Sequence, residues 1–138
     1  MPLFTSTYTN RVDKKGRVSV PAPFRATLPD GDQSVAAFPS LISRAIEGFD
    51  YGYLEHISDR LNNFDMLVSP RQKQDPAAKI LSRSITLSID NDGRMVLPRE
   101  FMKHAGIADR AVFVGLGRTF QIWGPEEYTA AMAEDGEG

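Results

Sequence analysis

The chain has no cysteine, a single tryptophan and only two histidines among its 138 residues. Without cysteine it cannot form disulfides, thiolate zinc sites, iron–sulfur clusters or a cysteine nucleophile, and this composition suits a reducing cytoplasm. No apolar run is long enough to cross a bilayer. The first five residues also lack the basic and apolar regions of a secretory signal. We therefore expect a cytoplasmic protein with no membrane association.

The chain as a whole has little excess of either sign of charge, because 16 basic and 18 acidic side chains leave a formal net charge of −2. The two ends nevertheless differ. Residues 1–29 carry a net charge of +4 and residues 108–138 a net charge of −4. The near-neutral total argues against indiscriminate binding of polyanions, whereas a local basic cluster can still bind phosphates, because nearby charges dominate the field at a surface. The alternative is that these charges only solvate the surface.

One motif occurs twice, 77 positions apart, in residues 11–25 and residues 88–102. Five positions are identical in type, spacing and order: Asp13/Asp90, Gly16/Gly93, Arg17/Arg94, Pro21/Pro98 and Phe24/Phe101. Such agreement predicts two copies of one supersecondary unit. We place the copies at residues 5–54 and 83–128, and we expect a helical insert over residues 55–82 between them.

Each copy combines two alternating strands with a tight turn. A strand at residues 8–12 or 85–89 leads into Asp-x-x-Gly, in which glycine allows the positive φ of a hairpin turn and aspartate bonds the turn's backbone. Proline ends the returning strand and begins a short helix, at residues 22–28 or 99–105. A second hairpin follows in each copy. We expect a mainly β protein with short helices, in which the two copies form a pseudo-twofold β-barrel.

The insert and the carboxyl end have patterns of their own. Ser58 or Asp59 is predicted to cap a helix that extends to residue 68, and Asp75-Pro76 is typical of the start of a second helix, which would extend to residue 83. Residues 129–138 form a short acidic tail that we expect to be disordered.

The repeated motif, Asp-x-x-Gly-Arg-apolar-x-apolar-Pro before a short helix, resembles the SpoVT-AbrB swapped-hairpin DNA-binding fold. Two copies in one chain of this length, over nearly the whole sequence, resemble the MraZ family. The resemblance implies a bacterial transcriptional regulator, in the cytoplasm and associated with the nucleoid. It also implies a homo-oligomer, in the form of a ring, that binds double-stranded DNA at direct repeats in the promoter of the division and cell-wall gene cluster.

The first turn is the more basic of the two. The residues that we predict to contact DNA are Arg11, Lys14, Lys15, Arg17, Arg25 and Arg94. A two-stranded β-ribbon can enter the major groove, where an arginine fork can read guanine, whereas lysines suit phosphates as point charges. We therefore assign Arg17 and Arg11 to base edges or close phosphates, and the two lysines to the backbone. By analogy with single-repeat relatives, Arg25 would flank the same surface.

The second turn keeps Arg94 but has lost most other basic residues, since Asn91 and Asp92 replace the two lysines and Met102 replaces Arg25. The first copy is therefore expected to dominate contact with DNA, and the second to serve folding, oligomer contacts or a lesser DNA role. In the alternative interpretation, Arg17 and Arg94 pair with nearby carboxylates inside the barrel.

No nucleophile, metal cluster or acid pair stands out, and the stretch at residues 90–93 lacks the further acidic ligands of a calcium loop. We expect no enzymatic activity, no cofactor, no metal and no small-molecule ligand. Two other functions compete with DNA regulation. An antitoxin-like module would bind a protein toxin and its own operator, but two repeats and a short tail count against it. A scaffold for protein interactions is disfavoured by the basic first turn.

Overall fold

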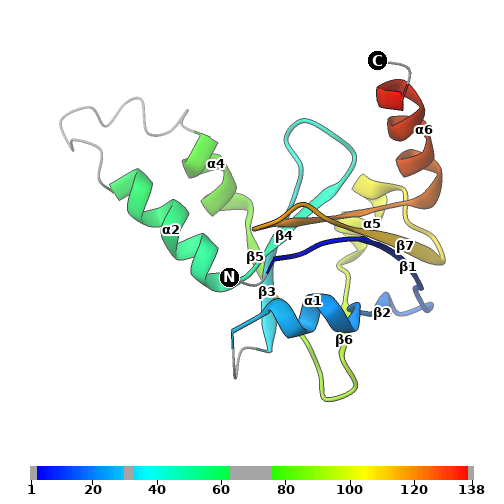
Figure 1. Cartoon of the computed structure of the whole chain (residues 1–138), viewed down its shortest axis with the longest axis horizontal. Coiled ribbons are helices and arrows are strands. Elements are labelled where there is room, and N and C mark those ends of the chain that lie inside the picture. The colour runs from blue at the N-terminus through cyan, green and yellow to red at the C-terminus, as the bar shows by residue number, and fades with distance from the viewer. Residues whose placement is uncertain (1–2, 30–32, 63–75, 137–138) are drawn as a thin grey trace.

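A computed structural model of the chain describes residues 3–29, 33–62 and 76–136, and within them the protein is mainly β with short helices (Figure 1). The strands are β1 (Thr7–Arg11), β2 (Arg17–Ser19), β3 (Ser34–Pro39), β4 (Ile46–Phe49), β5 (Ile85–Ser88), β6 (Arg94–Val96), β7 (Arg110–Gly115) and β8 (Phe120–Trp123). The helices are α1 (Ala22–Thr27), α2 (Tyr51–Asn62), α4 (Pro76–Arg83), α5 (Arg99–Ala105) and α6 (Pro125–Gly136).

The strands form two antiparallel sheets rather than a closed barrel. Six strands pair in the order β1-β7-β8-β4-β3-β5, and β2 and β6 form a separate two-stranded ribbon. The predicted barrel is therefore not found among the described strands. The sheet is open because its two edge strands, β1 and β5, do not pair with each other, and after each of them the next strand joins the ribbon instead of the sheet.

Strand pairing crosses repeatedly between the two halves of the chain. The first strand of each half pairs with the third strand of the other, since β1 lies against β7 and β5 lies against β3. Equivalent residues of the two motifs also make equivalent backbone bonds. The amide of Val20 donates to the carbonyl of Gly93 at 2.9 Å, and the amide of Leu97 donates to the carbonyl of Gly16 at 2.8 Å.

The two Asp-x-x-Gly turns form as predicted, but the long hairpins do not. Gly16 and Gly93 have φ of +86° and +79°, and their amides donate to the carbonyls of Asp13 and Asp90. In the first copy, the strands on either side of the turn are joined by one isolated bridge, between Val12 and Val18. The β1–β2 ribbon expected from the sequence is thus reduced to this bridge, and the strands pair instead as β1 with β7 and β2 with β6.

The main core lies between the six-stranded sheet and the short helices. Phe24 of α1 is its centre, because the ring contacts Phe4, Phe113 and Phe120 at centroid distances of 5.3, 6.1 and 5.4 Å. Phe101 of α5, the repeat equivalent of Phe24, is buried in the same core. The predicted helices α1 and α5 are thus confirmed, and α5 ends as expected at a left-handed Gly106 with φ of +66°.

The insert is helical, but its first helix begins earlier than predicted. Asp50 accepts a hydrogen bond from the amide of Tyr53 at 2.9 Å, so α2 begins at Tyr51 and neither Ser58 nor Asp59 caps it. The helix therefore runs across the unit boundary that we placed at residue 54. The remainder of the predicted helix, residues 63–68, lies outside the described residues, as does Asp75, whereas α4 matches its prediction.

The carboxyl end is a helix up to Gly136, so the prediction of a disordered tail from residue 129 is wrong there. Tyr128 packs against Trp123 with ring centroids 6.1 Å apart, and this contact holds α6 on the sheet. Glu126 and Glu127 lie in the first turn, where the helix dipole favours acidic side chains. Among the helices described here, none is long and apolar enough to span a membrane.

Candidate nucleic-acid interface

The two repeated turns meet on one ribbon. In the β2–β6 register, Arg17 lies opposite Val96 and Ser19 lies opposite Arg94. Val18 and Met95, between these positions, are buried in the main core. Because side chains alternate across a strand, the buried pair anchors the ribbon while Arg17 and Arg94 project from its exposed face.

Arg17 is held in place by the aspartate of its own turn. Its Nε donates to Oδ2 of Asp13 at 2.7 Å, and the Arg17 side chain remains 45% exposed. The other carboxylate oxygen of Asp13 accepts the amides of Lys15 and Arg17, each at 2.9 Å. The backbone amide of Arg17, followed by its guanidinium, lowers the pKa of the Asp13 carboxyl below its ordinary value. The turn thus fixes the base of the arginine while the side chain still reaches solvent.

Arg94 is equivalent in sequence but differs in its contacts. Asp90 accepts the amides of Asp92 and Arg94 at 2.9 and 3.0 Å, and the Arg94 amide is the main cause that lowers the pKa of Asp90. Within the described ranges, the guanidinium of Arg94 makes no ion pair or hydrogen bond. Arg17 therefore pairs with a carboxylate of its own exposed turn rather than inside a barrel, and among these residues Arg94 pairs with none.

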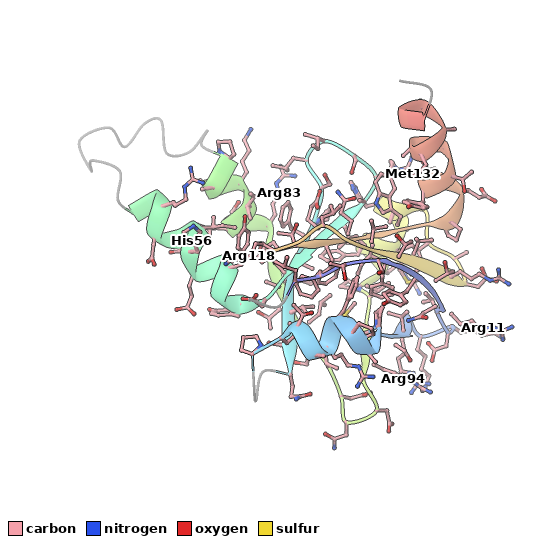
Figure 2. All side chains as sticks on the ribbon, viewed as in Figure 1. Arg11, His56, Arg83, Arg94, Arg118 and Met132 are labelled. Carbon is pink, nitrogen blue, oxygen red and sulfur yellow. The ribbon has the colours of Figure 1, made fainter. Side chains whose placement is uncertain are left out.

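A hollow of about 570 Å³ lies between the ribbon and the edge of the large sheet. It brings together three of the arginines predicted from sequence and adds a fourth from β7; the lining residues are Asn10, Arg11, Val12, Asp13, Arg17, Ser19, Arg94, Asp109 and Arg110. Figure 2 shows Arg11 and Arg94 projecting on the same side of the molecule, away from His56 and Arg83. We call this the arginine hollow. Sequence reasoning missed Arg110, whose only local signal was a basic residue at the start of a strand.

The two lysines of the first turn line a different hollow. Lys14 and Lys15 lie with Arg99 and Lys103, which α5 presents one helical turn apart. All four side chains are exposed. Sequence reasoning missed Arg99 and Lys103, although their spacing of four on a short helix already placed them on one face. The six predicted residues therefore do not form one cluster, because the first turn separates its lysines from its arginine.

Arg25 lies against the second turn rather than the first. Its Nε donates to the carbonyl of Val20 at 3.2 Å, and its guanidinium covers Gly93 so closely that a Cβ there would be 2.8 Å from the guanidinium carbon. Met102 covers Gly16 in the same way, with its sulfur 3.5 Å from the position of a Cβ. Arg25 of α1 and its repeat equivalent, Met102 of α5, thus each pack onto the turn of the other half of the chain.

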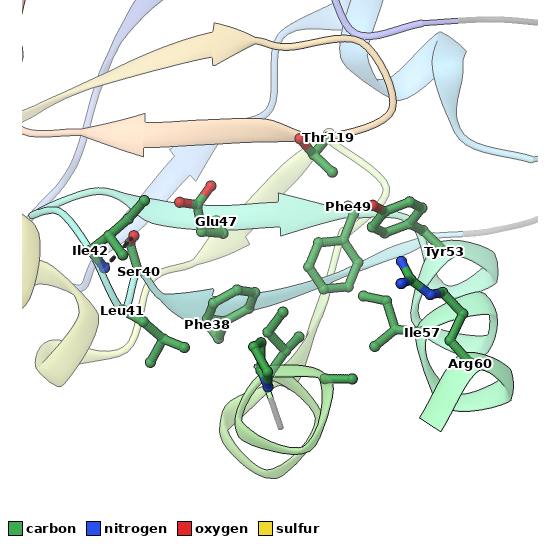
Figure 3. Close-up of a pocket in the computed structure, with 13 residues that line it drawn as sticks. Phe38, Ser40, Leu41, Ile42, Glu47, Phe49, Tyr53, Ile57, Arg60 and Thr119 are labelled. Atoms are coloured by element: carbon green, nitrogen blue, oxygen red, sulfur yellow. Dashed lines mark hydrogen bonds between the residues drawn. The ribbon is translucent and has the colours of Figure 1, made fainter. Parts of the chain in front are cut away.

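An apolar groove of about 540 Å³ lies between the large sheet and the helices α2 and α4 (Figure 3). Phe38 and Phe49 of the sheet face Tyr53 and Ile57 of α2, and the polar side chains at its margins are Ser40, Glu47, Arg60 and Thr119. The groove is therefore a mainly apolar recess with a few polar side chains at its margins. Across the described part of the chain, no group of three or more His, Asp or Glu residues is placed to hold a metal ion.

The sequence of the chain is similar to a known protein family and to known proteins. Residues 80–137 match a family model described as "MraZ protein, putative antitoxin-like". Three proteins named transcriptional regulator MraZ are similar over most of their length. The one from Gluconobacter oxydans is 40% identical over 91% of this chain and 78% of its own, that from Pelagibacter ubique 42% over 91% and 81%, and that from Xanthobacter autotrophicus 41% over 97% and 85%.

These relatives are regulators and not enzymes, in agreement with the conclusion drawn from the sequence. At such identity over nearly the full length, the chain belongs to the MraZ family.

Proposed function

We propose that this protein is a DNA-binding transcriptional regulator and that the β2–β6 ribbon is the element that it presents to double-stranded DNA. The observation that carries the proposal is the union of the two Asp-x-x-Gly-Arg turns, 77 residues apart in sequence, on one ribbon with Arg17 and Arg94 exposed. The name of the relatives, transcriptional regulator, supports it.

The chemistry of the surface suits a duplex. A two-stranded ribbon fits the width of the major groove, and an arginine fork can bond the O6 and N7 atoms of guanine. Lys14 and Lys15, with Arg99 and Lys103 beside them, offer point charges for the phosphates of one strand. Arg25 would act through the second turn, which it covers.

A homo-oligomer, in the form of a ring, on direct promoter repeats of the division and cell-wall gene cluster would explain how a subunit of net charge −2 binds DNA. Several weak ribbons on one assembly meet several DNA repeats, and the second contact gains from a high effective concentration. The exchange of strands between β1–β7 and β5–β3 supports the swapped-hairpin arrangement within each subunit. Such a regulator would work in the cytoplasm at the nucleoid.

The second candidate is an antitoxin-like module that binds a protein toxin and its own operator, which the description of the family favours. Rescue of growth by this chain, when a toxin encoded beside it is expressed, would identify that function. The apolar groove at Phe38 and Tyr53 would then be the surface to mutate.

The decisive experiment measures binding of the full chain to a fluorescent duplex from upstream of its own gene, beside a scrambled duplex, across salt concentrations. The variants are Arg17→Ala and, as a matched control far from the ribbon, Arg83→Ala on α4. We expect specific binding that Arg17→Ala abolishes and Arg83→Ala preserves, with a slope of about −0.9 per phosphate contact in log affinity against log salt. Equal affinity for both duplexes would contradict the proposal.

A further inference from the structure

We propose that Arg11 and Arg110 form a clamp for a single backbone phosphate of the bound DNA, at the sheet side of the arginine hollow. The inference rests on the proposed function and deepens it. It assigns Arg11 to a phosphate rather than to a base edge. It also adds Arg110, from the second half of the chain, to the residues that touch DNA.

The first argument is a like-charge pair in the sheet. Arg11 and Arg110 are directly opposite partners in the β1–β7 register. Opposed residues of an antiparallel pair have their Cβ atoms about 4.5–5.5 Å apart, and like charges at such positions are destabilising. Both side chains are exposed, on the face that the hollow occupies. An anion between them would turn this repulsion into attraction.

No carboxylate of the described structure fills that place. Asp13 is engaged with Nε of Arg17 and with two amides of its own turn. Asp109 lies beside Arg110, yet neither it nor the two opposed arginines takes part in an ion pair among the described residues, where the pairs are Arg17–Asp13 and Arg44–Glu127. The hollow therefore carries an excess of positive charge, with four arginines against two aspartates.

The second argument is that the hollow has rigid walls. The side-chain amide of Asn10 donates to the carbonyl of Ser19 at 2.6 Å, which ties the residue before Arg11 to the ribbon. The amide of Val12 donates to the carbonyl of Asp109 at 2.9 Å, which ties the residue after Arg11 to the residue before Arg110. The backbone at the two arginines is thus tied to the ribbon that carries Arg17 and Arg94. A backbone that is already ordered loses less entropy when the side chains that it carries bind a ligand.

The ligand is a phosphodiester because of where the hollow lies. It is continuous with the exposed face of the ribbon, whose arginines would reach base edges. A ribbon in the major groove has a phosphate strand along each side. Arginine suits that strand because its planar fork can contact two phosphate oxygens at once. A free phosphate ion offers the same oxygens, so the experiment must separate the two sources.

The test compares Arg110→Ala, Arg11→Ala and the double variant with Arg83→Ala in the full chain, on the upstream and scrambled duplexes. We expect Arg110→Ala to weaken binding to both duplexes by the same factor, roughly three- to tenfold, and to reduce the salt slope by about 0.9. The double variant should lose less than the product of the two single losses, because both side chains contact one phosphate. A loss confined to the upstream duplex would overturn the phosphate assignment.

Folding is controlled by the thermal midpoint, which should stay the same or rise in Arg110→Ala at low salt, because the opposed charges are removed. A scan with duplexes that each carry one neutral methylphosphonate should find a position that weakens the wild-type protein and leaves the double variant unaffected. Absence of any such position would overturn the clamp.

The remaining outcomes separate this inference from the function on which it rests. If Arg17→Ala abolishes specific binding while Arg110→Ala behaves like Arg83→Ala, the clamp is wrong and the regulator stands. If inorganic phosphate raises the thermal midpoint through Arg110 but DNA affinity does not depend on that residue, the site binds a free anion and the clamp is also wrong. If the wild-type protein does not bind DNA, both proposals fall.

Discussion

The carboxylate of Asp13 accepts a hydrogen bond from Nε of Arg17 at 2.7 Å, whereas Asp90 accepts only backbone amides in the equivalent turn. The two repeated arginines therefore share one ribbon but not one environment. Arg17 is oriented before any ligand arrives, and Arg94 makes no ion pair within the described residues. Orientation by a neighbouring carboxylate lowers the entropy that a side chain loses on binding.

Replacement of Asp13 by asparagine should separate the turn from the orientation of Arg17. Asparagine keeps one oxygen for the amides of Lys15 and Arg17 but loses the acceptor for Nε. Asp90→Asn is the matched control, because it removes the same charge from a carboxylate that accepts the amide of its arginine but has no hydrogen bond to the guanidinium. We expect Asp13→Asn to bind the upstream duplex about two- to fivefold more weakly than Asp90→Asn, as for an exposed charge pair. Equal affinities in a fluorescence titration would contradict an orienting role.

Arg17→Ala should reduce DNA affinity more than Arg94→Ala. Arg17 is held by Asp13, and Lys14 and Lys15 lie in the same turn, whereas the second turn carries Asp90 and Asp92. Titration of both variants against the upstream duplex measures the difference. Equal losses would show that the ribbon uses its two halves alike and that the charge difference between the turns has no consequence.

Gly16→Ala should destabilise the protein more than Gly117→Ala. Both glycines have positive φ, of +86° and +91°, which costs alanine roughly 1–2 kcal/mol. At Gly16, however, a Cβ would lie 2.8 Å from the carbonyl oxygen of Leu97, and at Gly117 it would meet nothing within 4 Å. Urea unfolding of the two variants isolates the clash from the backbone strain, and equal free energies of unfolding would mean that the turn yields without cost.

Phe24→Ala should cost about 3–5 kcal/mol in the free energy of unfolding, as expected for a large buried aromatic ring. The ring is 1% exposed and contacts three other phenylalanines and Tyr8. Ile42→Ala is the control, since that side chain is 93% exposed and its loss should stay within about 0.5 kcal/mol. A small effect of Phe24→Ala in denaturant titrations would place the centre of the core elsewhere.

Acid should weaken the fold through both turns. The pKa values of Asp13 and Asp90 lie below the ordinary value of 3.8, chiefly because each carboxylate accepts the backbone amide of its arginine. Their stabilising contribution is therefore complete above pH 3.8 and is lost as the pH falls through the lowered values. The thermal unfolding midpoint of the wild type should fall as the pH is lowered below about 4. The Asp13→Asn/Asp90→Asn double variant should lose less thermal stability over the same pH range. If its midpoint changes with pH as that of the wild type does, the two turns are not the cause of the acid sensitivity.

The sequence by itself determined the features that depend on a few neighbouring residues. The Asp-x-x-Gly turns and the end of α5 at Gly106 follow from bonds or dihedral angles within about four residues of chain. The repeat also showed that two such turns exist. The predicted start of α2 was wrong because Asp50, which lies earlier in the chain than Ser58 and Asp59, accepts the amide of Tyr53 at the beginning of the helix.

Only the tertiary structure decided which strands pair. An alternating pattern specifies which face of a strand is buried but not which partner lies beside it. The two halves bury their apolar faces by pairing strands with each other: β2 pairs with β6, and β1 pairs with β7. With this pairing the sheet is open rather than a barrel, and the guanidinium of Arg25 lies over Gly93. Arg110 lies opposite Arg11, which is 99 positions away in the chain. The arginine hollow exists because of this pairing, and no local pattern in either half contains it.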